Sequence, residues 1–194
     1  MPNAFAIFDS LYIIKQTKKQ CSGLSVQELD FLSYFACLLS LYQGHPVTDW
    51  GYVYLRNVFG APISADILEA CQLLEKNSQL QRHDTVYNIT ERGEVRLTFY
   101  MDLDEFKFRK PYLDAACDCL LVESILDVLS TISKDAVILE SSVHGLKYLN
   151  STDNSALSVL YQQFEVIKKA IGNRSNLFIP ATSWLLFLKE NQEV

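Results

Sequence analysis

The chain has 194 residues, 49% of them hydrophobic and 21% charged, a balance that is typical of a folded globular protein and excludes a disordered one. This length suffices for one domain, or for two small ones that share a core. The formal net charge of −6 disfavours a general nucleic-acid coat protein, because binding of phosphates needs a local excess of lysine and arginine. No apolar run approaches the roughly 18–20 residues that a membrane span requires.

The cysteines and the N-terminal segment indicate a cytoplasmic protein with reduced thiols. Secreted disulfide scaffolds use dense, even sets of cysteine, whereas this chain has five. The basic residues near the N-terminus follow the apolar stretch, which is the reverse of a signal peptide. We therefore expect free thiols at Cys21, Cys37, Cys71, Cys117 and Cys119.

Residues 1–24 form the first predicted unit, an apolar helix over residues 4–18. Its side chains are apolar nearly all round, so it must be buried, either in the core of this chain or against a partner. Its lysines follow the apolar residues, as suits a helix C-terminus.

The next segment predicts three helices in succession. A capping-box pattern at 25–28 opens a helix that ends near Tyr42, because Gly44 and Pro46 follow it. Further helices are expected over 48–59 and 64–77. The expected cap residues are Ser25 for the first helix, Thr48 or Asp49 for the second, and Ser64 for the third.

After the third helix the hydrophobic period changes, and residues 80–89 predict a short β-hairpin. Residues 90–93 (TERG) then start another helix. The phrase YNITERG at 87–93 resembles the second wing strand and the following helix cap of winged-helix proteins. The resemblance and the element order imply a winged-helix domain over 25–103, within a mainly α protein.

Residues 104–194 predict a helical C-terminal domain packed on the winged helix. A charged, aromatic connector is followed by an expected long helix over 112–132. Residues 134–149 favour a helix, with a strand at 136–139 as the alternative. An apolar stripe over 157–171, ended by Gly172, and a last helix over 181–189 that follows Pro180 complete the chain.

No group of residues meets the requirements of a catalytic site, so we expect no enzyme activity, no cofactor, no metal and no small-molecule substrate. The three histidines form no HxH or HExxH pair, and the chain has no glycine-rich phosphate loop. Cys117 and Cys119 are two residues apart in a predicted helix, where their side chains diverge by about 200° and cannot easily share a metal.

The helix over 64–77 would enter the major groove if the winged helix read DNA. It carries three carboxylates and one lysine. In the wing, Asp84 offsets much of the charge of Arg82 and His83. This face would repel phosphates, so the sequence favours protein partners over direct DNA contact.

The connector interleaves aromatic and basic residues, a pattern typical of contact with an acidic partner or with nucleic acid. The alternative is that the aromatics fill the interface between the two halves while the cations stay solvated, and the acidic residues just upstream favour this alternative. The candidate contact residues are Phe106, Lys107, Phe108, Arg109 and Lys110.

The two ends of the chain, around 5–8 and 177–188, are apolar, and either pack into the core or dock on a larger subunit. Size, acidity and the winged-helix phrase resemble the small middle subunit of Lamassu-like, SMC-type bacterial defence systems. The resemblance implies a non-catalytic scaffold that bridges an SMC-like ATPase and an effector nuclease in antiviral or anti-plasmid defence, with DNA contacted mainly through those partners. A winged-helix transcriptional regulator and a dimerising antitoxin-like or sensor protein remain the alternatives.

Overall fold

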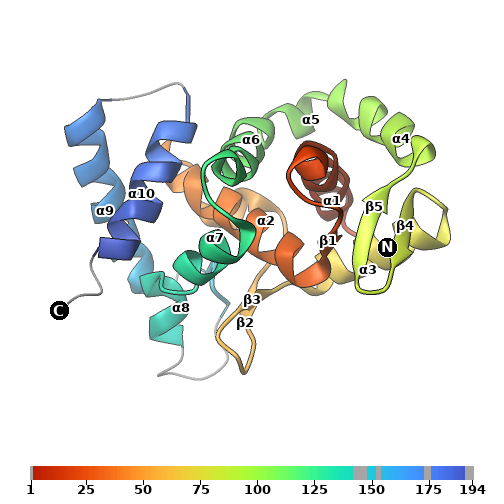
Figure 1. The fold of residues 1–194 in the computed structure, drawn as a ribbon. Helices are drawn as coiled ribbons and strands as arrows, with labels where there is room; N and C mark the ends of the chain where they lie inside the picture. Colours follow the sequence, from red (N-terminus) through yellow and green to blue (C-terminus); the bar gives the residue numbers. More distant parts are fainter. Residues whose placement is uncertain (1, 142–147, 152–153, 173–175, 191–194) are drawn as a thin grey trace.

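The computed structural model describes residues 2–141, 148–151, 154–172 and 176–190, and confirms a mainly helical protein with small antiparallel sheets (Figure 1). The main helices are α1 (Ala4–Gln16), α2 (Val26–Tyr42), α3 (Ala65–Lys76), α4 (Glu91–Met101), α6 (Lys110–Asp118), α7 (Ile125–Ile132), α9 (Ala156–Ile171) and α10 (Phe178–Glu190). The short helices are α5 (Asp104–Lys107), α8 (Ala136–Ser141) and the 3₁₀ turns η1 (Thr17–Lys19), η2 (Val47–Trp50) and η3 (Cys119–Leu121). The strands are β1 (Leu24–Ser25), β2 (Leu55–Arg56), β3 (Pro62–Ile63), β4 (Leu80–His83) and β5 (Val86–Ile89).

Helix α2 runs through the centre of the molecule and contacts α1, α3, α6, α7 and α9 (Figure 1). Its side chains from Leu29 to Ser40 are all buried. The predicted capping box is present: the Ser25 hydroxyl accepts a hydrogen bond from the Glu28 N–H, and the Glu28 carboxylate accepts one from the Ser25 N–H at 2.6 Å. A local signal thus fixes where the central helix begins.

Helix α1 is buried within this chain, so its expected burial is confirmed and its packing is internal. It contacts α2, α3, α4 and α6. The side chains from Ala6 to Ile14 are buried, and the Asn3 side chain caps its first turn. The helix therefore belongs to the core rather than forming a separate N-terminal arm.

The predicted hairpin is confirmed as β4 and β5, and β5 lies between β4 and β1 in a three-stranded antiparallel sheet. Asp84 adopts a positive φ of 54° in the turn, a conformation that aspartate tolerates better than most residues. Thr90 caps α4 as predicted, because its hydroxyl accepts from the Gly93 N–H at 3.2 Å.

The predicted helix over 48–59 is wrong. Only η2 is helical there, and Gly51 then turns the chain with a φ of 88°. Tyr52, Val53 and Tyr54 favour extended backbone, and the chain continues into the hairpin formed by β2 and β3. The Asn57 side chain organises its turn by accepting from two backbone N–H groups, those of Phe59 and Ala61.

Two further expectations are corrected. The helix predicted over 112–132 is divided into α6, η3 and α7, because Ser124 interrupts the run and caps α7 by accepting from the Asp127 N–H. Ser64 precedes α3, but its side chain makes no capping hydrogen bond. Its N–H instead donates to the buried Asp30 carboxylate at 3.1 Å.

The C-terminal segments pack on α2 from the side opposite α1 (Figure 1). Residues 136–139 are helical in α8, which decides against the strand alternative, whereas 142–147 lie outside the described residues. The Trp184 ring packs against Phe35 of α2 and Phe164 of α9, so the predicted stripe and last helix form one core. Among the described residues, no helix is both long and apolar enough to cross a bilayer.

The buried carboxyl of Asp135 lies at the start of α8 and predicts a pH-dependent stability. The Tyr34 hydroxyl donates to it at 2.8 Å. Burial raises its pKa to about 6, although Tyr34 and the first N–H groups of α8 oppose this rise. Since aspartate in an unfolded chain has a pKa of about 3.9, the folded state binds the proton more tightly between about pH 4 and pH 6, and stability falls as the pH rises through this window.

We expect Asp135→Asn to be nearly neutral at pH 4 and to stabilise the protein by about 2–3 kcal/mol at pH 7, because the variant has no buried charge to form. Urea denaturation of both proteins from pH 4 to pH 7.5 measures the difference. The contributions of the other titrating groups to the free energy of unfolding are the same in both proteins and cancel when the two are subtracted. A gap that stays constant over the whole range would contradict the assignment.

Candidate interaction surfaces

The connector residues at 106–110 do not form one surface. Phe106 is buried, and its ring packs against Phe5, Phe8 and Tyr100. This contact joins α5 to α1 and α4, as expected for an aromatic that fills an interface. Phe106 is therefore a core residue, and its ring is not accessible to a partner.

The expectation that the connector cations stay solvated is wrong for Arg109, whose side chain is 1% exposed. Its guanidinium donates to both oxygens of the buried Asp9 carboxylate, in a bidentate ion pair. It also donates to the Trp50 carbonyl at 2.5 Å and stacks on the Trp50 ring, 3.8 Å from the centroid. The ion pair links α1, η2 and the start of α6.

The buried network continues from Asp9 into the tyrosines that follow Gly51. The Tyr52 hydroxyl donates to Asp9 at 2.6 Å, and the Tyr54 hydroxyl donates to the Tyr52 oxygen at 3.2 Å. Burial raises the pKa of both tyrosines well above their usual range. These buried side chains form hydrogen bonds with one another and are closed off from solvent. The network therefore joins α1 and the start of α6 to the segment after η2, and it offers no group to a substrate.

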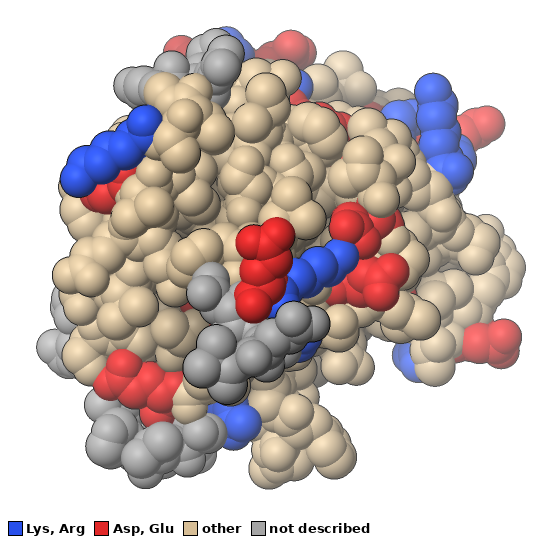
Figure 2. Space-filling view, turned by 60° about the vertical axis from the view of Figure 1, so that its left-hand side comes forward, with Lys and Arg blue, Asp and Glu red and all other residues tan. Residues whose placement is uncertain are grey.

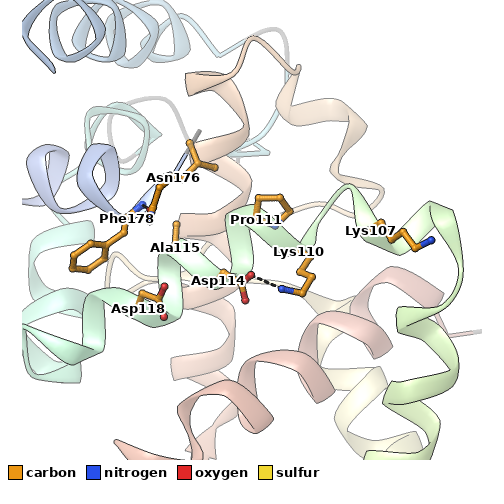
Figure 3. A pocket seen from close by; sticks show the side chains of 9 residues that line it. Lys107, Lys110, Pro111, Asp114, Ala115, Asp118, Asn176 and Phe178 are labelled. Carbon is orange, nitrogen blue, oxygen red and sulfur yellow. Dashed lines mark hydrogen bonds and ion pairs between the residues drawn. The ribbon is translucent and has the colours of Figure 1, made fainter. Parts of the chain in front are cut away.

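The remaining connector residues lie at the surface. Lys107 pairs with Asp104, and Lys110 pairs with Asp114 at 2.7 Å. The Phe108 ring, 36% exposed, packs edge-on against His45. Both lysines line a shallow pocket of about 400 Å³, shown in Figure 3, in which the dashed line marks the Lys110 ion pair. With each cation next to a carboxylate, the pocket has no net attraction for anions.

The exposed surface of α3 is acidic in the structure, as the sequence indicated. On α3, Glu69 and Glu75 are exposed and Asp66 is half-buried, while Lys76 is the single cation of the helix. In the hairpin, the Arg82 side chain donates to the Asp84 carbonyl and lies over the Tyr87 ring. The arginine of the hairpin is therefore held against the backbone of its own turn.

A protruding apolar surface at the β2–β3 turn is the feature that sequence reasoning missed. Val58 and Phe59 are 88% and 90% exposed. Phe59 and Leu126 of α7, itself 74% exposed, line the same groove of about 390 Å³. We name Val58, Phe59 and Leu126 the apolar ridge. The sequence signal for it is the turn pattern of Asn57 and Gly60, which encloses two apolar residues and competes with the helix predicted over 48–59.

The apolar C-terminal segment is largely core. Trp184, Leu185 and Leu188 are buried, whereas Ile179 and Leu186 are 42% and 53% exposed. Figure 2 brings the left-hand side of Figure 1 forward and shows a surface that is mostly uncharged, with scattered charged groups. This face has no concentrated charge that would favour a nucleic acid.

The thiols and histidines assemble no reactive group within the described part of the chain. All five cysteines are free and four are buried, and burial raises the pKa of Cys37 and Cys117, which disfavours the nucleophilic thiolate. His45 packs against aromatic rings, and His83 is exposed at the end of β4. Among the described residues, no three metal-ligating side chains converge.

No family model matches the chain, and neither the curated proteins nor the solved structures contain a significant match.

Proposed function

We propose that this chain is a non-catalytic subunit that binds a partner protein through the apolar ridge. The observation that carries the proposal is the exposure of Phe59, 90% of whose surface is open to solvent beside a groove. Monomeric proteins seldom expose large apolar side chains in a group, and aromatic side chains beside grooves are typical anchors of protein interfaces.

The order of elements supports a winged-helix unit as the frame of this subunit. Three helices, α1, α2 and α3, pack on one another and are followed by the hairpin of β4 and β5. Strand β1 lies between α1 and α2 in the chain and pairs with β5. On this proposal the unit begins with α1 rather than at residue 25, because residues 48–59 do not supply a helix.

The charge on α3 supports a protein partner over DNA. Asp66, Glu69 and Glu75 would face the phosphate backbone in a major-groove complex, and Lys76 alone would oppose them. Each carboxylate near DNA adds repulsion and releases no counterion. The winged-helix frame is compatible with a partner other than DNA because a fold does not specify a function.

Phe59→Ser tests the proposal, with Phe99→Ser on α4 as the matched control, since Phe99 is also exposed, at 63%. The tagged wild type and both variants are purified from the native cells. We expect the proteins that are recovered with the wild type in stoichiometric amounts to be recovered with the Phe99→Ser control as well. Removing an anchor of this kind costs about 2 kcal/mol or more, a roughly 30-fold loss of affinity, so Phe59→Ser should lose at least one of these proteins. Quantitative mass spectrometry of the three purifications measures this.

Equal recovery with the Phe59 and Phe99 variants, or a wild type that purifies only as a homodimer, would contradict the proposal. Binding of duplex DNA by the isolated protein at physiological salt, abolished by Lys76→Ala or Arg82→Ala, would favour the transcriptional regulator instead. That the partners are an SMC-like ATPase and an effector nuclease stays a prediction, which the identity of the recovered proteins decides.

A further inference from the structure

A second groove, away from the apolar ridge, lies between the end of α1 and α4. It has a volume of about 680 Å³ and is lined by residues of α1, η1, α4, η3 and the end of α6. Its floor is apolar: Leu97 is buried, and Met101 and Leu121 are 40% and 62% exposed. The exposed part of this floor would be covered by apolar side chains of a bound segment.

Lysines line the other side of this groove. Lys15 and Lys18 both lie near the Glu94 carboxylate, at 2.6 and 3.5 Å, so two cations share one anion. Lys19 also lines the groove and has no ion pair within the described part of the chain. Against these three cations the lining offers two carboxylates, those of Glu94 and Asp118. The groove is therefore locally positive in a chain whose net charge is −6.

The lysines complement the dipole of α1, whose C-terminus lies here, but this role does not require an apolar floor beside them. We infer that this lysine groove binds an acidic amphipathic segment of a partner protein. Apolar side chains of the segment lie on Leu97, Met101 and Leu121, and its carboxylates approach Lys18 and Lys19. Opposite charge across such a contact speeds association and selects the partner.

A protein segment suits the groove better than an anionic membrane does. A membrane surface attracts a protein through a broad basic patch, whereas here the surplus charge is confined to one turn of chain in an acidic protein. A segment of this kind also leaves the apolar ridge free, because Val58 and Phe59 belong to a different element. The lysine groove and the apolar ridge can then each bind a partner segment at the same time, and binding in the groove does not depend on what binds the ridge.

The experiment selects displayed random 16-residue peptides on the immobilised full chain and measures the enriched peptides by fluorescence anisotropy. We expect the enriched peptides to be acidic, with apolar residues three or four positions apart. Lys18→Glu/Lys19→Glu should weaken their binding at least tenfold. Lys76→Glu/Lys169→Glu, the same charge change on α3 and α9, should leave it unchanged, as should Phe59→Ser, which separates this inference from the proposed function.

Enrichment of neutral or basic peptides, or equal binding to the two lysine double variants, would overturn the inference. Sedimentation with phosphatidylserine vesicles that is lost in Lys18→Glu/Lys19→Glu would also overturn it, in favour of a membrane. Near-ultraviolet circular dichroism confirms that each variant is folded; the double variant keeps Lys15 beside Glu94, so its helix packing should persist.

Discussion

Replacing Arg109 by methionine lowers the free energy of unfolding by about 3–5 kcal/mol, because it leaves the buried Asp9 carboxylate without its counter-ion. Methionine keeps much of the side-chain volume, so the loss reports mainly on charge and hydrogen bonds. The Trp50 carbonyl also loses its donor in this variant. Urea denaturation at pH 7 measures the change.

The control is the double variant Asp9→Asn/Arg109→Met, which removes both charges. We expect it to recover a large part of the loss, because a buried ion pair contributes little beyond the cost of burying its two ions. A double variant that is less stable than Arg109→Met would contradict this account. So would a loss below about 1 kcal/mol for the single variant, since that is the range of exposed ion pairs.

The buried ion pair of Arg109 makes the connector cations unequal as targets for a binding test. A charge reversal at Arg109 would unfold the protein and would remove any partner as a consequence. Lys107 and Lys110 both lie at the surface. Substitutions of these two cations can therefore test partner binding without unfolding the protein. The sequence pattern at 106–110 combines a core ion pair with two surface lysines.

The features predicted correctly from sequence are those with local causes. The capping box at Ser25, the cap at Thr90 and the hairpin between them each depend on residues within a few positions of one another. The burial of α1 also followed from composition, because a helix with apolar residues on every side must be covered.

The missed features depend on contacts between distant residues. Asp9 and Arg109 are 100 residues apart, and no local pattern marks either as the partner of the other. Thr48 or Asp49 as a cap, with Gly60 and Pro62 as a stop, predicts a helix over 48–59 that does not form. Gly51 and the β-favouring residues after it decided the backbone instead. A helix over 48–59 implies a buried apolar face, so this prediction does not indicate that Phe59 is exposed.

Gly93→Ala is expected to lower the free energy of unfolding by about 2–3 kcal/mol, although alanine is the better helix former by about 1 kcal/mol. A Cβ at this position would lie 2.2 Å from the Gln79 carbonyl oxygen and 2.8 Å from Ile89 Cγ1. That carbonyl cannot retreat easily, because it accepts from both the N–H and the hydroxyl of Thr90. The clash therefore separates α4 from the sheet.

Two controls separate this steric cause from backbone and surface effects. Gly44 has open space around a Cβ but a φ of 84°, so Gly44→Ala should cost about 1–2 kcal/mol through backbone strain alone. Arg92→Ala, at an exposed position of α4, should stay within about 0.5 kcal/mol of the wild type. A Gly93→Ala protein as stable as the wild type in urea would mean that α4 can move away from Gln79 and β5 without loss. In that case the glycine of the TERG phrase would not be required by the packing of the hairpin on the helix that follows it.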